Sequence, residues 1–267
     1  MNNCKIVFSD IDGTLLNSNH KVTPLTKDAI HTLHQKNIPF VIVSARSPSG
    51  IYPIMNDNNF TGPIIAYSGA LILNEKREII YSTGIQRDET IRIISYAEEM
   101  HLDIHWCAYC IDEWIVKDKS SPRVKLEESI VRTQSKEKPL TDFSASAEFN
   151  KIMFICNSNE IGDIEKQMQK AFPEYSIVRS SELMLEIMKK GITKGTAVTN
   201  LCSIWHINPA DSIAFGDNYN DVPMLNAVGT GYLMANAPLE LKKQFTNGTL
   251  DNNHDGIYSK LLDLKLI

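Results

Sequence analysis

The chain has 267 residues, of which 43% are apolar and 22% charged, a composition typical of globular proteins rather than of fibrous or disordered ones. Its 27 basic and 32 acidic side chains leave a formal charge of −5 without a basic stripe, which argues against a nucleic-acid-binding protein. No apolar run approaches the roughly 18 residues of a membrane-spanning helix, so we expect no membrane partner.

The five cysteines are scattered along the chain, and only Cys107 and Cys110 lie close together. An odd number of widely spaced cysteines is more typical of a protein in the reducing cytoplasm than of one stabilised by disulfides. The N-terminal apolar stretch is short and lies between Lys5 and acidic residues, which argues against a signal peptide. We therefore predict a cytoplasmic protein. The C-x-x-C spacing suits a redox site, but its flanks predict a strand instead of the helix start that such a site needs.

Residues 1–82 alternate short apolar strands with helices. Thr23 before Pro24 is typical of a helix N-terminus, because the hydroxyl caps the first turn and proline fits its first position. The predicted strands are residues 5–9, 39–43, 64–73 and 79–82, and a second helix is predicted near 48–57. This alternation indicates an α/β fold with a Rossmann-like parallel sheet and helices on both faces.

The pattern changes after about residue 83. The predicted elements are a helix over 86–100, a strand-like run over 104–117, a strand over 151–156, a helix over 159–172 and two short strands within 176–187. Alternation along the run 104–117 places Trp106 and Trp114 on one face and Tyr109 on the other. We therefore predict an α+β domain over residues 83–187, inserted into the α/β domain.

The alternating pattern returns over residues 188–267. The predicted elements are a helix over 194–205, strands over 212–215 and 229–234, a helix over 219–226, and helices near 238–244 and 255–264. The simplest organisation is one α/β core made of residues 1–82 and 188–267, with the insert between the two parts.

Two carboxylates follow the first predicted strand, in the sequence DIDGT at 10–14. Ligands of open parallel sheets bind beyond the carboxyl ends of the strands. Asp10 can act there as a nucleophile, and Asp12 can move a proton to the leaving oxygen. Gly13 permits a tight turn, and Thr14 can hydrogen-bond locally. A solvated acidic turn explains this motif about as well when it is taken alone.

A second cluster, Asp217, Asn220 and Asp221, follows another predicted strand. Together with Asp10 and the backbone carbonyl of Asp12, these hard oxygen ligands suit an octahedral Mg²⁺ ion that keeps some of its waters. An acidic helix cap would explain one of these residues, but not the whole cluster after an apolar strand.

Two further positions can bind phosphate oxygens. Lys194 lies at a predicted helix start with glycine close on either side, where it can neutralise a phosphate or a group of carboxylates. Ser44 follows the strand 39–43, where a hydroxyl and nearby helix amides can hold phosphate oxygens, and Arg46 lies two residues on. Each of these signals is weak alone.

The order of these motifs resembles the haloacid-dehalogenase-like (HAD) hydrolase superfamily. Within it, the chain is similar to the Cof-type phosphatases, in which a large α+β cap domain is inserted between the second and third motifs. The resemblance covers nearly the whole chain and includes SGA at 68–70 and MANAP at 234–238. The positions that depart from the usual pattern are Ala45, Ser68, Ala235 and His254.

The resemblance implies a phosphatase acting on a small phosphate ester. Asp10 would attack phosphorus and form an aspartyl-phosphate, and Asp12 would protonate the leaving alcohol and then activate water. Ser44 and Lys194 would bind the transferring phosphoryl group, and Asn220 would help them. Substrates known in the family include sugar phosphates, a phosphorylated flavin precursor, pyridoxal phosphate and nucleotides.

The resemblance also implies a Mg²⁺ cofactor. Asp10, the backbone carbonyl of Asp12 and Asp217 would hold the ion. Asp221 would support the metal shell or orient Lys194. Arg46 would contact substrate.

Two other functions stay open from the sequence. A sugar-phosphate mutase would use the same first motif and return the phosphoryl group to its substrate. A binding or regulatory protein on the same scaffold would need neither nucleophile nor acid, so the presence of both Asp10 and Asp12 argues against it. The sequence leaves the substrate and the oligomeric state open.

Overall fold

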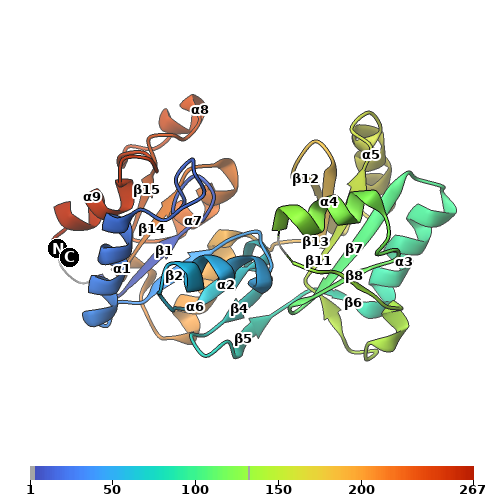
Figure 1. Cartoon of the computed structure of the whole chain (residues 1–267), viewed down its shortest axis with the longest axis horizontal. Helices are drawn as coiled ribbons and strands as arrows, with labels where there is room; N and C mark the ends of the chain where they lie inside the picture. The colour runs from blue at the N-terminus through green and yellow to red at the C-terminus, as the bar shows by residue number, and fades with distance from the viewer. Residues whose placement is uncertain (1–3, 132) are drawn as a thin grey trace. The chain divides into compact units, whose positions relative to one another are not determined.

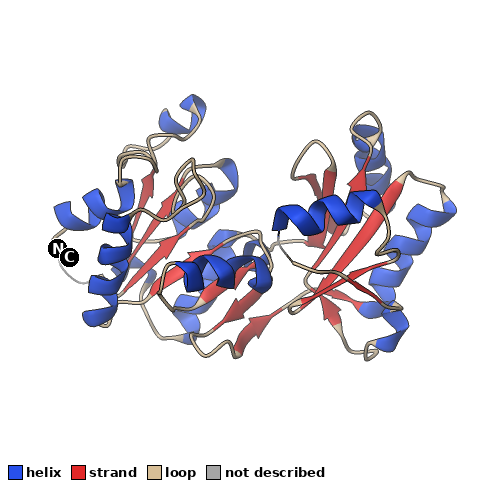
Figure 2. Ribbon diagram, in the orientation of Figure 1, coloured by secondary structure: helices blue, strands red, loops and turns tan. Residues whose placement is uncertain are grey.

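The structure is a computed structural model that describes residues 4–131 and 133–267, and it divides into two compact units. The core unit runs up to Arg46 and continues with Ile51–Tyr81 and Thr193–Ile267. The insert unit comprises Ser47–Gly50 and Ser82–Ile192. Each unit is a sheet with helices packed on it (Figures 1 and 2). Within the described ranges, every helix is too short or too polar to cross a membrane.

The core unit is built on a seven-stranded sheet with the order β15-β14-β1-β2-β3-β4-β5. Its strands are β1 (Ile6–Ser9), β2 (Phe40–Val43), β3 (Ile64–Ala66), β4 (Leu71–Leu73), β5 (Ile79–Ser82), β14 (Ser212–Gly216) and β15 (Thr230–Leu233). The first strand, β1, lies between β2 and β14, is parallel to both, and is buried along its whole length. A strand covered on both faces needs a continuous apolar run, which explains the sequence of residues 6–8.

The predicted strand 64–73 is wrong, because the chain turns in its middle. The strands β3 and β4 pair antiparallel on either side of a tight turn over Tyr67–Gly69. Tyr67, Ser68 and Gly69 have φ angles of 50°, 53° and 122°. Residues other than glycine rarely adopt this left-handed backbone conformation, so Tyr67 and Ser68 do not indicate a turn by their type, and only Gly69 favours one. The core sheet is therefore parallel through its centre and antiparallel at β3–β4.

Helices cover both faces of the core sheet, which confirms the predicted fold class. They are α1 (Pro24–Gln35), α2 (Pro48–Asp57), α6 (Lys194–Ile204), α7 (Val222–Ala227), α8 (Leu239–Lys242) and α9 (Gly256–Asp263). Ile6 and Phe8 pack with α6, α7 and α8 in one apolar cluster, whereas α1 contacts β2 and α9. Figure 1 shows α1 and α2 on one side of this sheet and α6 on the other. The first helix begins as predicted, with the Thr23 hydroxyl accepting a hydrogen bond from the Thr26 N–H.

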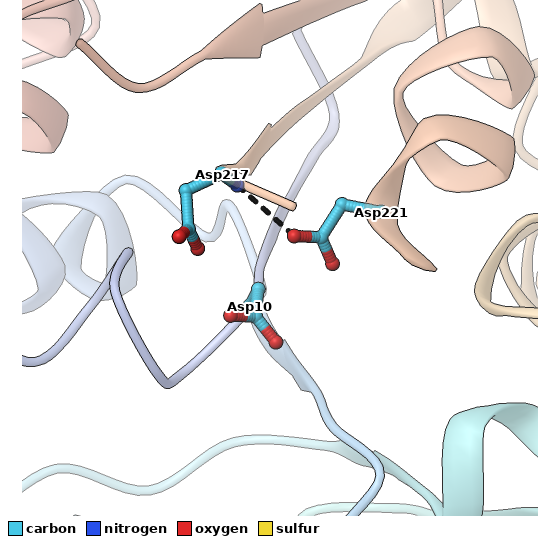
Figure 3. Close-up of side chains that lie close together, drawn as sticks. All are labelled: Asp10, Asp217 and Asp221. Carbon is cyan, nitrogen blue, oxygen red and sulfur yellow. Dashed lines mark hydrogen bonds between the residues drawn. The ribbon is translucent and has the colours of Figure 1, made fainter. Parts of the chain in front are cut away.

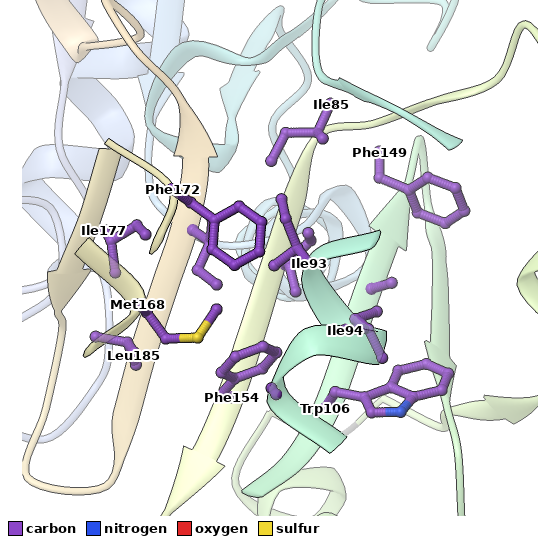
Figure 4. Close-up of a cluster of buried hydrophobic side chains, with 14 of the residues drawn as sticks. Ile85, Ile93, Ile94, Trp106, Phe149, Phe154, Met168, Phe172, Ile177 and Leu185 are labelled. Carbon is purple, nitrogen blue, oxygen red and sulfur yellow. The ribbon is translucent and has the colours of Figure 1, made fainter. Parts of the chain in front are cut away.

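The insert unit has a six-stranded sheet with the order β12-β13-β11-β7-β8-β9. Its strands are β7 (Ile104–Cys110), β8 (Glu113–Val116), β9 (Lys136–Glu137), β11 (Lys151–Cys156), β12 (Tyr175–Arg179) and β13 (Met184–Lys189), and β6 (Ile85–Gln86) pairs separately with β10 (Glu148–Phe149). Its helices are α3 (Arg87–Glu99), α4 (Pro122–Val131) and α5 (Ile161–Ala171). Phe154 on the sheet, Ile93 on α3 and Met168 on α5 belong to one buried apolar cluster (Figure 4). The insert unit therefore has a hydrophobic core of its own.

The predicted alternation along residues 104–117 is wrong for Trp114. The chain folds back as a hairpin in which Tyr109 lies opposite Trp114, and the two rings stack with centroids 5.8 Å apart. Trp106 instead belongs to the buried cluster with α3 and α5. The chain turns at Ile111, which has a φ of 56°. β-branched residues rarely adopt that angle, so the presence of isoleucine at this position does not indicate a turn.

The cysteines are all free thiols. Cys107 and Cys110 lie on β7 and not at a helix start. Burial raises the pKa of Cys107 to about 12 and that of Cys156 to about 12. A thiol that stays protonated is a poor nucleophile, so Cys107 acts as a packing residue rather than as a redox centre.

Replacing Phe154 with alanine should destabilise the insert unit. Phe154 is fully buried in the apolar cluster, and such truncations cost about 3–5 kcal/mol. Urea unfolding followed by circular dichroism measures the change. Val178→Ala is the control, because Val178 lies on the same sheet but is 50% exposed, and its loss should stay within about 0.5 kcal/mol. Equal losses in both variants would contradict the assignment of this core.

Candidate active site

The parallel pairing of β1 with β14 brings the two acidic motifs together. Ser9 at the end of β1 is in register with Phe215, and the Asp10 N–H donates to the Phe215 carbonyl at 3.1 Å. Asp10 and Asp217 therefore leave the sheet at the same edge, beyond the carboxyl ends of adjacent strands. This is the edge at which open α/β sheets bind ligands.

A buried ammonium group links the two motifs. The Nζ atom of Lys194 lies 2.5 Å from Oδ1 of Asp10 and 2.5 Å from Oδ1 of Asp221. Lys194 is only 1% exposed and Asp221 is fully buried. Burial lowers the pKa of Lys194, but the charges of Asp10 and Asp221 outweigh this effect and the net pKa is raised. Lys194 thus stays charged and joins β1, β14 and α6 at one point.

The second oxygen of Asp221 organises the turn after β14. Oδ2 accepts the backbone N–H groups of Asp217 and Asn218, both at 3.0 Å, and Figure 3 shows the bond to Asp217. Asn218 in turn caps the short helical turn that contains Asp221, so a helix cap is present here as well as the acidic cluster. Both oxygens of Asp221 are therefore engaged by protein groups.

Asp217 is held by residues from two other loops. Its Oδ1 accepts the Thr14 hydroxyl at 2.8 Å, and its Oδ2 lies 3.3 Å from Nδ2 of Asn236. Thr14 was expected to bond locally, but its partner lies 203 residues away in sequence. Gly13 has a φ of +84°, and a Cβ atom there would lie 2.4 Å from Oδ2 of Asp217. Only glycine allows this approach.

Three carboxylates converge at this edge of the sheet. Oxygens of Asp10, Asp217 and Asp221 all lie within 4.8 Å of one another (Figure 3). Burial raises the pKa of Asp10 to about 8, although the Lys194 ammonium opposes the shift. Burial also raises the pKa of Asp217 to about 6. Three acidic side chains therefore share a single buried lysine.

Asp12 lies apart from this cluster. Its carboxylate is 52% exposed and receives a bidentate pair from Arg46, with Nε at 2.9 Å and Nη2 at 2.6 Å. A bidentate guanidinium contact orients a carboxylate and also stabilises it electrostatically. Arg46, which we predicted to contact substrate, thus donates two hydrogen bonds to the side chain of Asp12.

Ser44 and Asn220 occupy different surroundings. Ser44 follows β2, is buried, and its hydroxyl accepts the Arg46 N–H at 3.2 Å. The Ser68 N–H donates to the Ser44 carbonyl at 2.9 Å, so the turn after β3 packs beside it. Asn220 is exposed on the turn after β14. The structure brings Ser44 next to the Asp12–Arg46 pair, whereas it places Asn220 outside the buried cluster.

The N-terminus of α6 is anchored by two features that the sequence analysis did not identify. Thr193 and Thr196 form a reciprocal capping box, which the spacing T-x-x-T could have indicated. Gly69 packs so closely that a Cβ atom there would lie 2.7 Å from the Thr193 carbonyl oxygen. The strained turn at Tyr67–Gly69 therefore helps to place Lys194.

Replacing Lys194 with methionine should destabilise the core unit by about 3–5 kcal/mol, because two buried carboxylates would lose their shared cation. Lys5→Met is the matched control. Lys5 pairs with Asp211 at 2.8 Å, but its side chain is 50% exposed, and such pairs contribute about 0–1 kcal/mol. Urea denaturation at neutral pH compares the two. A Lys194 variant no less stable than the Lys5 variant would contradict the buried contacts of Lys194 with Asp10 and Asp221, which we call the Lys194 triad.

Comparisons with known proteins identify the family of this chain. Residues 7–261 match the family model of haloacid dehalogenase-like hydrolases. A Haemophilus influenzae protein, provisionally named as a phosphatase, is 39% identical over 254 residues, covering 95% of each chain. A Yersinia pseudotuberculosis protein named HMP-PP phosphatase is 25% identical over 246 residues, covering 90% of this chain and 87% of that one.

Solved structures are similar over nearly the whole chain. A haloacid dehalogenase-like hydrolase from Bacteroides thetaiotaomicron, 25% identical, has a TM-score of 0.86 and covers 97% of this chain and 99% of its own. A Thermotoga maritima protein, 24% identical, has a TM-score of 0.88 with 97% coverage of both chains and supports the fold alone. These matches confirm the family and the enzyme class predicted from the sequence. The chain belongs to the haloacid dehalogenase-like hydrolases.

Proposed function

We propose that this protein is a Mg²⁺-dependent phosphatase that hydrolyses small phosphate monoesters through an aspartyl-phosphate intermediate. The observation that carries the proposal is the buried Lys194, which contacts both Asp10 and Asp221 beside Asp217. A nucleophilic carboxylate, a fixed cation and further oxygen ligands then share one site, as phosphoryl transfer requires.

The residues present fit a divalent cation. Three carboxylates and one ammonium leave two formal negative charges in a partly buried site, and the donor atoms are all hard oxygens. Both oxygens of Asp221 are engaged, so we expect Asp10, Asp217 and the Asp12 carbonyl to hold Mg²⁺ and Asp221 to orient Lys194. When bound, the ion would neutralise charge on the phosphoryl oxygens.

The first step transfers the phosphoryl group to the enzyme. A carboxylate oxygen of Asp10 forms a bond to phosphorus while the bond from phosphorus to the ester oxygen breaks. Asp12, protonated before this step, gives its proton to that oxygen, and the alcohol leaves. In the structure both oxygens of Asp12 accept hydrogen bonds from Arg46, so Arg46 must release one of them before Asp12 can carry the proton. Ser44 and Lys194 bind the phosphoryl oxygens, and Asn220 reaches them from the turn after β14.

The second step regenerates the enzyme. Asp12, now ionised, takes a proton from a water molecule as that water attacks phosphorus. The bond between phosphorus and the Asp10 oxygen breaks, and inorganic phosphate and the free carboxylate result. Using one group as acid and then as base returns the proton balance to its start.

We assign substrate selection to residues 83–187, which would act as a cap domain. The insert unit has its own sheet and apolar core, so its surface can differ between relatives without disturbing the acidic cluster. Closure of a cap excludes bulk water from phosphoryl transfer. The likeness to the HMP-PP phosphatase adds a diphosphate ester to the candidate substrates.

Phosphate release from a panel of phosphorylated metabolites tests the proposal. The panel contains sugar phosphates, a phosphorylated flavin precursor, pyridoxal phosphate, nucleotides and a diphosphate ester. We expect release that requires Mg²⁺ and stops with EDTA. Isomerisation of a sugar phosphate without net release would instead indicate a mutase, and binding without turnover would indicate a regulatory protein.

Asp10→Asn should abolish turnover with the fold intact, because an amide oxygen is a far weaker nucleophile than a carboxylate. Phosphate release and circular dichroism are measured on the same preparation. Asp57→Asn is the control, because Asp57 is exposed at the end of α2 and does not belong to the acidic cluster. Normal activity of the Asp10 variant would refute the aspartyl-phosphate mechanism.

Asp12→Asn should lower kcat/KM by about 10²–10⁴-fold on alkyl phosphates, the usual contribution of a general acid–base. Nitrophenolate leaves without a proton, so formation of the intermediate from nitrophenyl phosphate should be less impaired than from an alkyl phosphate. Rapid-quench measurement of alcohol and phosphate release separates the two steps. Equal losses in the first step for both esters would argue against Asp12 as the acid.

A further inference from the structure

Three asparagines connect the segment between β15 and α9 to the loop that carries Asp10 and Asp12. Asn253 exchanges two hydrogen bonds with Ser18, at 3.0 and 2.9 Å. Asn252 donates from Nδ2 to the Leu16 carbonyl at 2.8 Å and from its backbone N–H to Oδ1 of Asn236 at 3.3 Å. We call these three residues, Asn236, Asn252 and Asn253, the asparagine ladder.

Asn236 is the inner end of the ladder. Its Nδ2 donates to the Gly13 carbonyl at 2.8 Å and lies 3.3 Å from Oδ2 of Asp217. One amide group therefore contacts both the turn of the first acidic motif and the carboxylate of the second. The sequence analysis noted the segment MANAP at 234–238 but assigned Asn236 no role.

We propose that Asn236 is a positioning residue that holds Asp217 in the orientation needed to bind Mg²⁺, and so sets the affinity for the ion. This inference rests on the proposed function, because it assumes that Asp217 is a metal ligand. Asn236 acts through Asp217 and Gly13 and does not itself contact the ion.

The hydrogen bonds of Asp217 explain how this would operate. The Thr14 hydroxyl engages Oδ1 and the Asn236 amide approaches Oδ2, so the carboxylate has a donor on each oxygen. A carboxylate oxygen that accepts one hydrogen bond retains a lone pair for a metal. Mg²⁺ demands nearly ideal octahedral geometry, so a carboxylate free to rotate would bind it less tightly.

The two donors come from different segments, which makes the role of Asn236 separable from that of Thr14. Thr14 belongs to the loop after β1, whereas Asn236 belongs to the loop after β15. The bond from Asn236 to the Gly13 carbonyl also sets the distance between these loops. Asn236 is exposed, so we expect its truncation to affect ion binding more than the stability of the fold.

Calorimetric titration of the full-length protein with MgCl₂, without substrate, tests the inference on Asn236→Ala, Asn236→Leu and Asn253→Ala. We expect both Asn236 variants to raise the Kd for Mg²⁺ by about 10–100-fold, as loss of a partner of a metal ligand usually does. Asn253→Ala removes the outermost bonds of the ladder and should leave the Kd unchanged. Saturating Mg²⁺ should restore kcat in the Asn236 variants.

The outcomes are distinguishable. If wild type binds Mg²⁺ and both Asn236 variants bind it equally well, the positioning role is refuted. If Asn253→Ala weakens binding as much as Asn236→Ala, the ladder acts by anchoring the loop, and a specific role of Asn236 is refuted. If wild type itself does not bind Mg²⁺, the metal part of the proposed function fails, and this inference fails with it. Melting temperatures in EDTA confirm that each variant is folded.

Discussion

The contact of Lys194 with Asp10 and Asp221 is the interaction on which the site depends. It joins the end of β1, the turn after β14 and the first turn of α6, three segments far apart in the sequence. Burying an ammonium and two carboxylates costs solvation energy that apolar side chains would not lose. The triad is therefore better explained by what it does at the site than by a contribution to stability.

The composition of this cluster suits the proposed chemistry. One ammonium faces three carboxyl groups, and burial, with a smaller effect of the neighbouring carboxylates, raises the pKa values of Asp10 and Asp217. A site of this kind attracts a cation that can also bind phosphoryl oxygens. Asp12 lies outside this carboxylate cluster. Its side chain is half exposed and pairs with Arg46. In the proposed mechanism the two aspartates of the first motif have different tasks, Asp10 as nucleophile and Asp12 as proton carrier.

Close approach of backbone segments makes the cluster possible. Gly13 lets Asp217 lie against the first motif, and Gly69 lets the turn after β3 pack against Thr193. The left-handed conformations of Tyr67 and Ser68 carry a conformational cost. Packing of this turn against α6 and the hydrogen bond from Ser68 to Ser44 compensate for this cost. The strained turn therefore helps to position α6 and Ser44.

Much of the fold and of the site could be predicted from local sequence. The apolar runs predicted β1, β2 and β14, the Thr23–Pro24 pair predicted α1, and the acidic motifs after two strands predicted that Asp10 and Asp217 would meet. The strands and the helix start follow from periodicity and capping, which act over short distances, and the meeting of the two acidic motifs follows from the general geometry of parallel sheets.

The errors came from residues whose conformation is set by tertiary contacts. The turns at Tyr67–Gly69 and Ile111 place Tyr67, Ser68 and Ile111 at φ angles that these residue types disfavour, so their types do not indicate the turns. Arg46 on Asp12, Thr14 on Asp217 and the asparagine ladder join segments up to 236 residues apart. The sequence by itself determined which groups could do the chemistry; only the tertiary structure decided which of them contact one another, because hydrogen bonds between loops depend on how distant segments pack.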